Sequence, residues 1–287
     1  MKAIGRVLVS ALAALTIAAA PPSRSCEPLR VMSYNIRLDL ASDGINQWSE
    51  RREQLVGQIR LMRPAILGLQ EVVPGQKADL EAALPEYQFL GVPRDDGRSR
   101  GEYSNLAIDR EAFRIGPSGT FWLSPTPEIP SKGWDAAYPR IATWAKLVRR
   151  SDGRRFLALN THLDHQGQQA RLEAARQILR FIAARRAAGE TIIVTGDLNA
   201  EPASPPMLEL TNRLRDSRMI SKTPAVGPEG TFNNFTLVPE QSPRIDYVLV
   251  DPAVSVERYA VLAWHGEGGR PASDHFAVVA DLGACAK

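Results

Sequence analysis

Short apolar runs separated by polar clusters recur along most of this chain. Nine of the runs read as β-strands, because their apolar residues are consecutive or alternate and turn-forming residues bound them. They are residues 29–33, 65–69, 87–92, 141–148, 156–160, 191–195, 245–250, 254–262 and 275–282. Apolar residues at helical spacing predict helices over 50–62, followed by Pro64, and over 168–188, followed by Gly189. The chain is therefore predicted to be a mixed α/β protein.

Many of these strands are separated by loops and not by helices. That arrangement favours two packed sheets flanked by helices over a single doubly wound parallel sheet. Stretches rich in Pro and Ser, at residues 124–131 and 203–206, are predicted to be surface loops within one domain. The sequence contains no visible internal repeat, heptad series or interdomain linker.

The first twenty residues differ in character from the rest. Lys2 and Arg6 precede an apolar stretch, residues 7–20, which is too short to span a bilayer comfortably and ends in small residues. This layout predicts a signal peptide over residues 1–20 and a secreted or periplasmic protein. Because Pro21 and Pro22 would hinder cleavage directly before them, an uncleaved N-terminal anchor is the alternative. Residues 21–28 are then a short lead-in to a single domain over residues 29–287.

Net charge gives little support for a polyanionic partner. Loss of residues 1–20 removes Lys2 and Arg6, so the formal net charge falls from +3 to +1. Nucleic-acid binding depends on many Lys and Arg contacts to phosphates, and the near-neutral chain gives no argument for binding duplex DNA. Residues 94–100 are locally basic but interrupted by acids, so they are either a solvated loop or a phosphate-facing one. No membrane contact beyond the N-terminal signal is expected, and we expect a monomer.

Polar clusters lie at the ends of the apolar runs, where a strand can hold reactive groups rigidly. These clusters are residues 33–37, 68–71, 160–164, 196–199, 245–247 and 273–275. Because side chains alternate along extended backbone, Asp197 and Asn199 point the same way, whereas Asp274 and His275 point to opposite faces. His275 is therefore expected to take its orienting carboxylate from Asp246, which leaves Asp274 free to face a cation.

The clusters supply Asp, Glu, Asn and His without a thiol or a serine nucleophile motif. Hard oxygen ligands of this kind suit Mg²⁺, Mn²⁺ or Ca²⁺ better than zinc. A divalent cation beside Asp and His acid–base groups is suited to the attack of water on a phosphate ester. The residues therefore predict a metal-assisted hydrolase of phosphate esters.

The chain resembles the endonuclease/exonuclease/phosphatase superfamily, and within it a secreted bacterial branch close to the deadenylase and nocturnin-like members, over about residues 29–282. The motifs that carry this resemblance include Ser33-Tyr34-Asn35-Ile36-Arg37, Gly68-Leu69-Gln70-Glu71, Gly101-Glu102-Tyr103, Pro139-Arg140, Asn160-Thr161-His162-Leu163-Asp164, Gly196-Asp197-Leu198-Asn199, Ile245-Asp246-Tyr247 and Ser273-Asp274-His275. The resemblance implies a DNase I-like fold. This is a four-layered α/β sandwich of two packed mixed sheets flanked by helices, with the site at one rim of the facing sheets.

The resemblance also implies a metal site and a water site. Glu71 would bind an essential Mg²⁺, for which Mn²⁺ is the alternative, and Asn35 and Asp274 would complete the surroundings of the ion. Asp197, steadied by Asn199, would activate or orient the attacking water.

The remaining roles concern the phosphate. His275, held by Asp246, would act as the base or stabilise the phosphoryl transition state, and the family leaves open whether it or Asp197 is the base. His162 would contact the phosphate together with Glu102, Arg140 and Asn199. Residues outside these motifs are less defined: His165 and His265 are interpreted as loop residues, and Asp39, Trp134 and Tyr138 are candidates either for lining the pocket or for anchoring loops.

The sequence leaves the substrate open among small phosphate mono- and diesters, nucleic acid and phospholipid head groups such as that of sphingomyelin. Small soluble phosphodiesters or single-stranded ends are favoured by elimination. A phosphoinositide is disfavoured, because Ala200 and Glu201 stand where the inositol-phosphatase branch carries Arg. A non-catalytic binding module of the same fold is the alternative. It would be expected to lack Glu71, Asp197 or His275, and all three are present.

Cys26 and Cys285 are the only cysteines. If Asn35 and His275 share a site, their strands run antiparallel, and both cysteines lie about 30 Å away at the opposite pole. In an exported protein such a pair is expected to form a disulfide.

Overall fold

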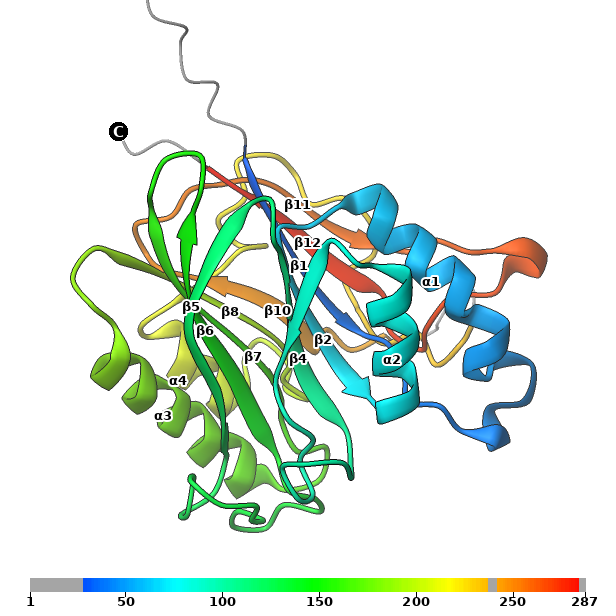
Figure 1. The fold of residues 1–287 in the computed structure, drawn as a ribbon, viewed down its shortest axis with the longest axis horizontal. Helices are drawn as coiled ribbons and strands as arrows, with labels where there is room; N and C mark the ends of the chain where they lie inside the picture. The colour runs from blue at the N-terminus through cyan, green and yellow to red at the C-terminus, as the bar shows by residue number, and fades with distance from the viewer. Residues whose placement is uncertain (1–27, 237–241, 284–287) are drawn as a thin grey trace, which may run out of the picture.

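Two mixed β-sheets of six strands each face one another in the computed structural model, which describes residues 28–236 and 242–283 (Figure 1). The first sheet holds, in spatial order, β11 (Val256–Leu262), β12 (Ala277–Leu282), β1 (Leu29–Asn35), β2 (Ile66–Val72), β4 (Tyr103–Asp109) and β3 (Tyr87–Leu90). The second holds β5 (Phe113–Trp122), β6 (Ile141–Arg149), β7 (Arg155–His162), β8 (Glu190–Asp197), β10 (Asp246–Val250) and β9 (Arg215–Asp216). In each sheet the central pair, β1 with β2 and β7 with β8, is parallel, and all other neighbours are antiparallel.

Helices cover the outer face of each sheet, so the molecule has the four layers that the sequence predicted (Figure 1). The helices α1 (Trp48–Met62) and α2 (Pro74–Ala83) pack on the first sheet, where Leu55 and Leu80 join its outer apolar residues. The helices α3 (Gln168–Arg185) and α4 (Pro205–Thr211) pack on the second sheet through Ile178 and Leu210. Two 3₁₀ turns, η1 (Ala41–Asn46) and η2 (Glu267–Gly269), lie in loops.

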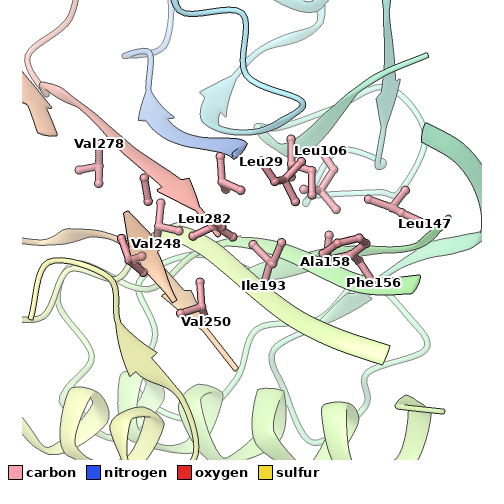
Figure 2. Packing of buried hydrophobic residues seen from close by; sticks show 14 of the residues in the cluster. Leu29, Leu106, Leu147, Phe156, Ala158, Ile193, Val248, Val250, Val278 and Leu282 are labelled. Atoms are coloured by element: carbon pink, nitrogen blue, oxygen red, sulfur yellow. The ribbon is translucent and has the colours of Figure 1, made fainter. Parts of the chain in front are cut away.

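Each helix layer packs against its sheet in an apolar core, and a third apolar core fills the space between the two sheets. Figure 2 shows Leu29 and Leu282 of one sheet meeting Ile193 and Val248 of the other in this third core. Inner-facing positions recur every second residue along each central strand. Toward one end of the strands these positions change from apolar to polar. The apolar set is Val31, Ala158, Ile193 and Val248, and the polar positions that follow are Ser33, Asn35, Asn160, His162, Thr195, Asp197 and Asp246, all buried.

A seam of buried polar groups joins the two sheets just before the strands end. Asn160 of β7 donates from Nδ2 to the carbonyl oxygens of Leu69 (2.8 Å) and Asn105 (2.9 Å), on the opposite sheet. Its Oδ1 accepts from Gln70 Nε2 (2.7 Å) and from Thr195 Oγ1 (3.0 Å). Buried hydrogen bonds of this kind fix the register of the two sheets against each other, since an unpaired group there would cost about 1–3 kcal/mol.

Several elements were not predicted from the sequence. The strands β4, β5 and β9 and the helices α2 and α4 are absent from the predicted set, and residues 203–206, predicted as a loop, contain the start of α4. Pro205 and Pro206 occupy the first turn of that helix, where a missing backbone N–H costs nothing. β5 is an edge strand with a register shift between Ile115 and Ser118, which accommodates its internal Gly and Pro residues.

The predicted signal peptide and the cysteine pair lie outside the described residues. Within them, Leu29 of β1 pairs with Leu282 of β12, so the strand ends that lead toward Cys26 and Cys285 are neighbours. Among the helices of the described segments, none has the length and apolar character needed to span a membrane.

Candidate active site

Strand register brings three of the predicted site residues into one row. His162 at the end of β7 is paired with Asp197 at the end of β8, and Asp197 is paired in turn with Asp246 at the start of β10. Each of these residues continues the inner-facing series of its strand, so their side chains enter the space between the sheets. Asn35 reaches the same space from the end of β1 in the facing sheet.

Unusual backbone conformations aim several other side chains at this space. Glu71 has a positive φ of 61° and lies in an irregularity of the β2–β4 pairing between Leu69 and Val72. Arg37 and Asn199, directly beyond the ends of β1 and β8, also have positive φ values, 55° and 45°. Such conformations cost of order 1–3 kcal/mol each in non-glycine residues and concentrate at functional sites. The bulge therefore turns the Glu71 carboxylate toward the row on the other sheet.

Asn35 is the centre of the group that results. Its Nδ2 donates to Glu71 Oε1 and to Asp197 Oδ2, each at 2.9 Å, and lies 3.5 Å from His275 Nε2. Its Oδ1 accepts the backbone N–H of Arg37 at 3.0 Å. Asn35 thus lies where the sequence placed it, but in this structure its amide nitrogen, and not its oxygen, faces the carboxylates.

The expected partner of His275 is the observed one. His275 Nδ1 lies 2.8 Å from Asp246 Oδ2, and the edge of the ring packs against Phe232, with 5.1 Å between the ring centroids. Burial alone would lower the pKa of His275, but the carboxylates of Asp246 and Asp197 outweigh it and raise that pKa well above its usual value. The two carboxylates therefore favour protonation of the His275 ring in the metal-free protein.

Asp197 is a buried acid beside a second acid, Asp246, and both conditions disfavour its ionised form. Burial first and the Asp246 carboxylate second raise the pKa of Asp197 to about 7. Its neighbour His162, whose Nε2 lies 3.5 Å from Asp197 Oδ2, is neutral, because burial and the nearby Arg140 guanidinium lower its pKa well below 6.5. Asn199 supports both residues: its backbone N–H donates to Asp197 Oδ1 at 3.0 Å, and its Nδ2 lies 3.1 Å from His162 Nε2.

Glu71, Asp197 and His275 form the one cluster of potential metal ligands found among the described residues, with ligand atoms within 4.8 Å of one another. Two carboxylates in a buried setting fit a hard divalent cation, and the raised pKa of Asp197 marks a place where added positive charge would relieve repulsion. Asp274 is not a member of this cluster. Its carboxylate lies 3.6 Å from Arg37 Nη1, and Asp274 lines the same cavity as His275.

A cavity of about 830 Å³ opens above this cluster and takes in Glu102 and Arg140 as well. Arg140 Nε donates to Asp164 (3.2 Å), and Glu102 forms an ion pair of 2.6 Å with Arg94. Burial raises the pKa of Glu102 despite that pairing. Eight of the ten predicted site residues line this cavity. The other two, Asn35 and Asp246, do not line it but contact the lining residues Asp197 and His275.

Arg94 and His165 are among the cavity residues that were not selected from the sequence. Arg94, the first of a stretch that was equally compatible with a solvated loop, is buried in the wall, whereas Arg98 and Arg100 are exposed. His165, interpreted as a loop residue, also lines the cavity. The ion pair of Arg94 with Glu102 could not be predicted from their separation in the sequence, because the two residues lie at the ends of an irregular loop. Among the candidate lining residues Asp39, Trp134 and Tyr138, only Tyr138 borders the cavity.

The chain belongs to the endonuclease/exonuclease/phosphatase family, because the model of that family matches residues 32–275. The fold is accordingly that of a family of phosphoester hydrolases. Similar solved structures include a mannosyl-6-phosphatase from Bacteroides thetaiotaomicron, which is 35% identical, with a TM-score of 0.84 over 88% of this chain and 99% of that one. A family member from Bacteroides vulgatus is also 35% identical, with a TM-score of 0.84 over 90% and 99% of the two chains.

A more distant relative is Nocturnin of Drosophila melanogaster, which is 28% identical over 204 residues. That match takes in 62% of this chain but only 30% of the fly protein. The likeness therefore concerns one part of the longer protein.

Proposed function

We propose that this protein is a divalent-metal-dependent hydrolase of phosphate esters that acts on small phosphomonoesters. The observation that carries the proposal is the cluster of half-buried Glu71 with buried Asp197 and His275, in a cavity that is also lined by Arg94 and Arg140. Carboxylates to hold a cation and guanidinium groups to receive an anion are what the hydrolysis of a phosphate ester requires.

Each residue has a defined task in this scheme. Glu71 and Asp197 would hold Mg²⁺ or Mn²⁺, which when bound neutralises charge on the phosphoryl oxygens. Asp197, kept ionised by the bound cation, would accept a proton from the attacking water or orient it. His275, kept cationic by Asp246, stabilises negative charge that develops on the phosphoryl group, and Asn199 and His162 orient its oxygens.

Two observations support the proposed substrate class. A volume of about 830 Å³ suits a small molecule, and the 35% identical mannosyl-6-phosphatase supports a sugar phosphate. The low net charge, +3 for the whole chain, gives no support for a duplex nucleic-acid substrate. A secreted nuclease or a sphingomyelinase-like phospholipase is the alternative, and both act on diesters. We further propose that the protein is exported by its N-terminal segment and acts as a monomer.

The test is phosphate release from mannose 6-phosphate, with a chromogenic phosphodiester measured in parallel. Activity is expected with Mg²⁺ or Mn²⁺, loss of activity with EDTA, and recovery when the ion is restored. Asp197→Ala and His275→Ala serve as inactive controls whose folding is checked by thermal unfolding. Hydrolysis that favours the diester would support the alternative. Absence of hydrolysis of monoesters, diesters and nucleic acids with either ion would leave the non-catalytic binding module as the surviving interpretation.

A further inference from the structure

One aromatic side chain stands exposed in the cavity wall. Tyr138 lies in the loop between β5 and β6 and is 52% exposed, although it lines the cavity. It belongs to none of the three apolar cores of the described segments, and its hydroxyl makes no hydrogen bond to any described residue. Packing of the fold therefore does not account for a tyrosine at this position.

The ring is nevertheless held in place from behind. The Arg94 guanidinium lies over it at 5.0 Å from the ring centroid, and the His165 ring is stacked with it, with 6.0 Å between the centroids and 20° between the planes. The backbone N–H of Tyr138 donates to Asp164 Oδ2 at 3.3 Å, the oxygen that also accepts from Arg140. Although burial opposes it, the backbone N–H of Gly167 and its neighbours lower the pKa of Asp164, so this acceptor stays ionised. The tyrosine is thus a preorganised surface.

Two unused hydrogen-bond donors lie beside this surface. Arg94 Nε and Arg140 Nη1 are buried and have no hydrogen-bond partner among the residues that the structure describes. Both arginines line the cavity, and the Arg140 side chain is only 6% exposed. Buried guanidinium donors left unpaired are costly, which points to an anionic ligand that completes them. A phosphate bound there would bring the group that it is esterified to against Tyr138.

We propose that Tyr138, backed by Arg94, is a specificity-determining residue that receives the ring of a pyranose phosphate. The proposal rests on the proposed function. A pyranose has one apolar face of C–H groups and a rim of hydroxyls, and Tyr138 offers one aromatic ring surrounded by Arg, His and Glu side chains. A nucleobase has two apolar faces, and the ring that stacks with Tyr138, that of His165, lies only 6.0 Å away, too close for a base to fit between the two.

The experiment compares three substrates on three variants. Mannose 6-phosphate carries the ring, glycerol 3-phosphate lacks one, and adenosine monophosphate carries a base. Tyr138→Ala is expected to raise KM for the hexose phosphate about tenfold, equivalent to about 1.4 kcal/mol, with kcat little changed and with KM for glycerol phosphate unaltered. Tyr138→Phe is expected to keep KM within about twofold, because the ring and not the hydroxyl makes the contact. Ile129→Ala, an exposed apolar residue of the same loop, is the matched control.

Calorimetric titration of the same three ligands and of inorganic phosphate separates this proposal from the proposed function. If the protein hydrolyses nothing but Tyr138→Ala weakens hexose-phosphate binding about tenfold and leaves phosphate binding intact, the ring contact stands and only the enzymatic function fails. An equal loss for all ligands would assign Tyr138 a structural role and overturn the proposal. So would no loss at all, or a loss confined to adenosine monophosphate.

Discussion

At the scale of single residues, the protonation of Asp197 should couple metal binding to pH. Its pKa is raised to about 7, so the folded protein retains a proton that the unfolded chain releases near pH 4. The metal-free protein should therefore lose stability as pH rises from about 4 to 7, and a cation that replaces the proton should restore it. We expect Mg²⁺ to raise Tm more at pH 8 than at pH 6, measured by thermal unfolding with and without EDTA.

The control for this prediction is Asp197→Asn. The variant removes the buried charge, so the metal-free protein should be at least as stable as the unaltered one and its Tm should vary less with pH. A Mg²⁺-dependent rise in Tm that is the same at both pH values in the unaltered protein would contradict the coupling.

His275 yields a second prediction at this scale. Burial lowers the pKa of His275, and the Asp246 carboxylate is the main group that raises it. Asp246→Asn should therefore lower that pKa while keeping a hydrogen-bonding side chain of the same size. If His275 acts as a cation, activity is lost as pH rises through its pKa, and the variant should lose activity at a lower pH. We also expect kcat to fall by at least about 100-fold. The measurement is the pH dependence of kcat for the folded variant and for the unaltered protein. If activity falls at the same alkaline pH in both, His275 does not act as a cation.

Strand alternation explains which of these residues could be predicted from the sequence. It excluded Asp274 as the partner of His275 and pointed to Asp246, and the 2.8 Å contact confirms this. The positions of Arg94 and Tyr138 could not be predicted in the same way, because both lie in irregular loops with no periodicity. The orientation of the Asn35 amide was equally hidden, since it depends on the left-handed backbone at Arg37.

At the scale of elements, the polar seam between the sheets should be sensitive to added volume. A Cβ on Gly68 of β2 would overlap the side chains of Thr195 and Asn160 on the opposite sheet. Gly68→Ala should therefore destabilise the protein by about 1–3 kcal/mol. Gly57 of α1 is exposed with no atom within 4 Å of its own Cβ position, so Gly57→Ala should stabilise it by about 0.5–1 kcal/mol. Chemical denaturation of both variants makes the comparison, and equal effects would contradict it.

Elements with a clear apolar pattern were the ones that could be predicted from the sequence. The predicted helix over 168–188 corresponds to α3, which buries one face against a core, and the predicted strand over 191–195 corresponds to β8, which is buried on both faces and reads as a continuous apolar run. The strands β4 and β5 carry Asn, Ser and Gly at positions that pairing and a register shift explain, and short α2 and α4 depend on packing more than on pattern. These elements are determined by strand pairing and packing in the folded protein, and their local sequence pattern does not reveal them.

At the scale of the whole molecule, the two cysteines remain a prediction. Leu29 and Leu282 are paired, and Cys26 and Cys285 lie three positions beyond them in sequence. A disulfide there would close nearly the whole domain and would add about 4–5 kcal/mol in the chain-entropy model. Peptide mapping of the exported protein with and without reductant is expected to find the linked pair, and the double change Cys26→Ser with Cys285→Ser is expected to lower Tm. Two free thiols in the oxidised protein would refute the pairing.

The order of elements around the two sheets has a further consequence. The first sheet and its helices contain the elements β1, α1, β2, α2, β3 and β4 in chain order, and the second sheet and its helices contain β7, α3, β8, α4, β9 and β10 in the same arrangement. The strands β11 and β12 extend the first sheet beside β1, as β5 and β6 extend the second sheet beside β7. Although no repeat is visible in the sequence, the two sheets have the same strand order, with the outer two strands of the first sheet supplied from the C-terminal part of the chain. Glu71 and Asp197 thus come from the corresponding strands β2 and β8 of the two halves. The site is a shared product of both halves, and neither half contains it alone.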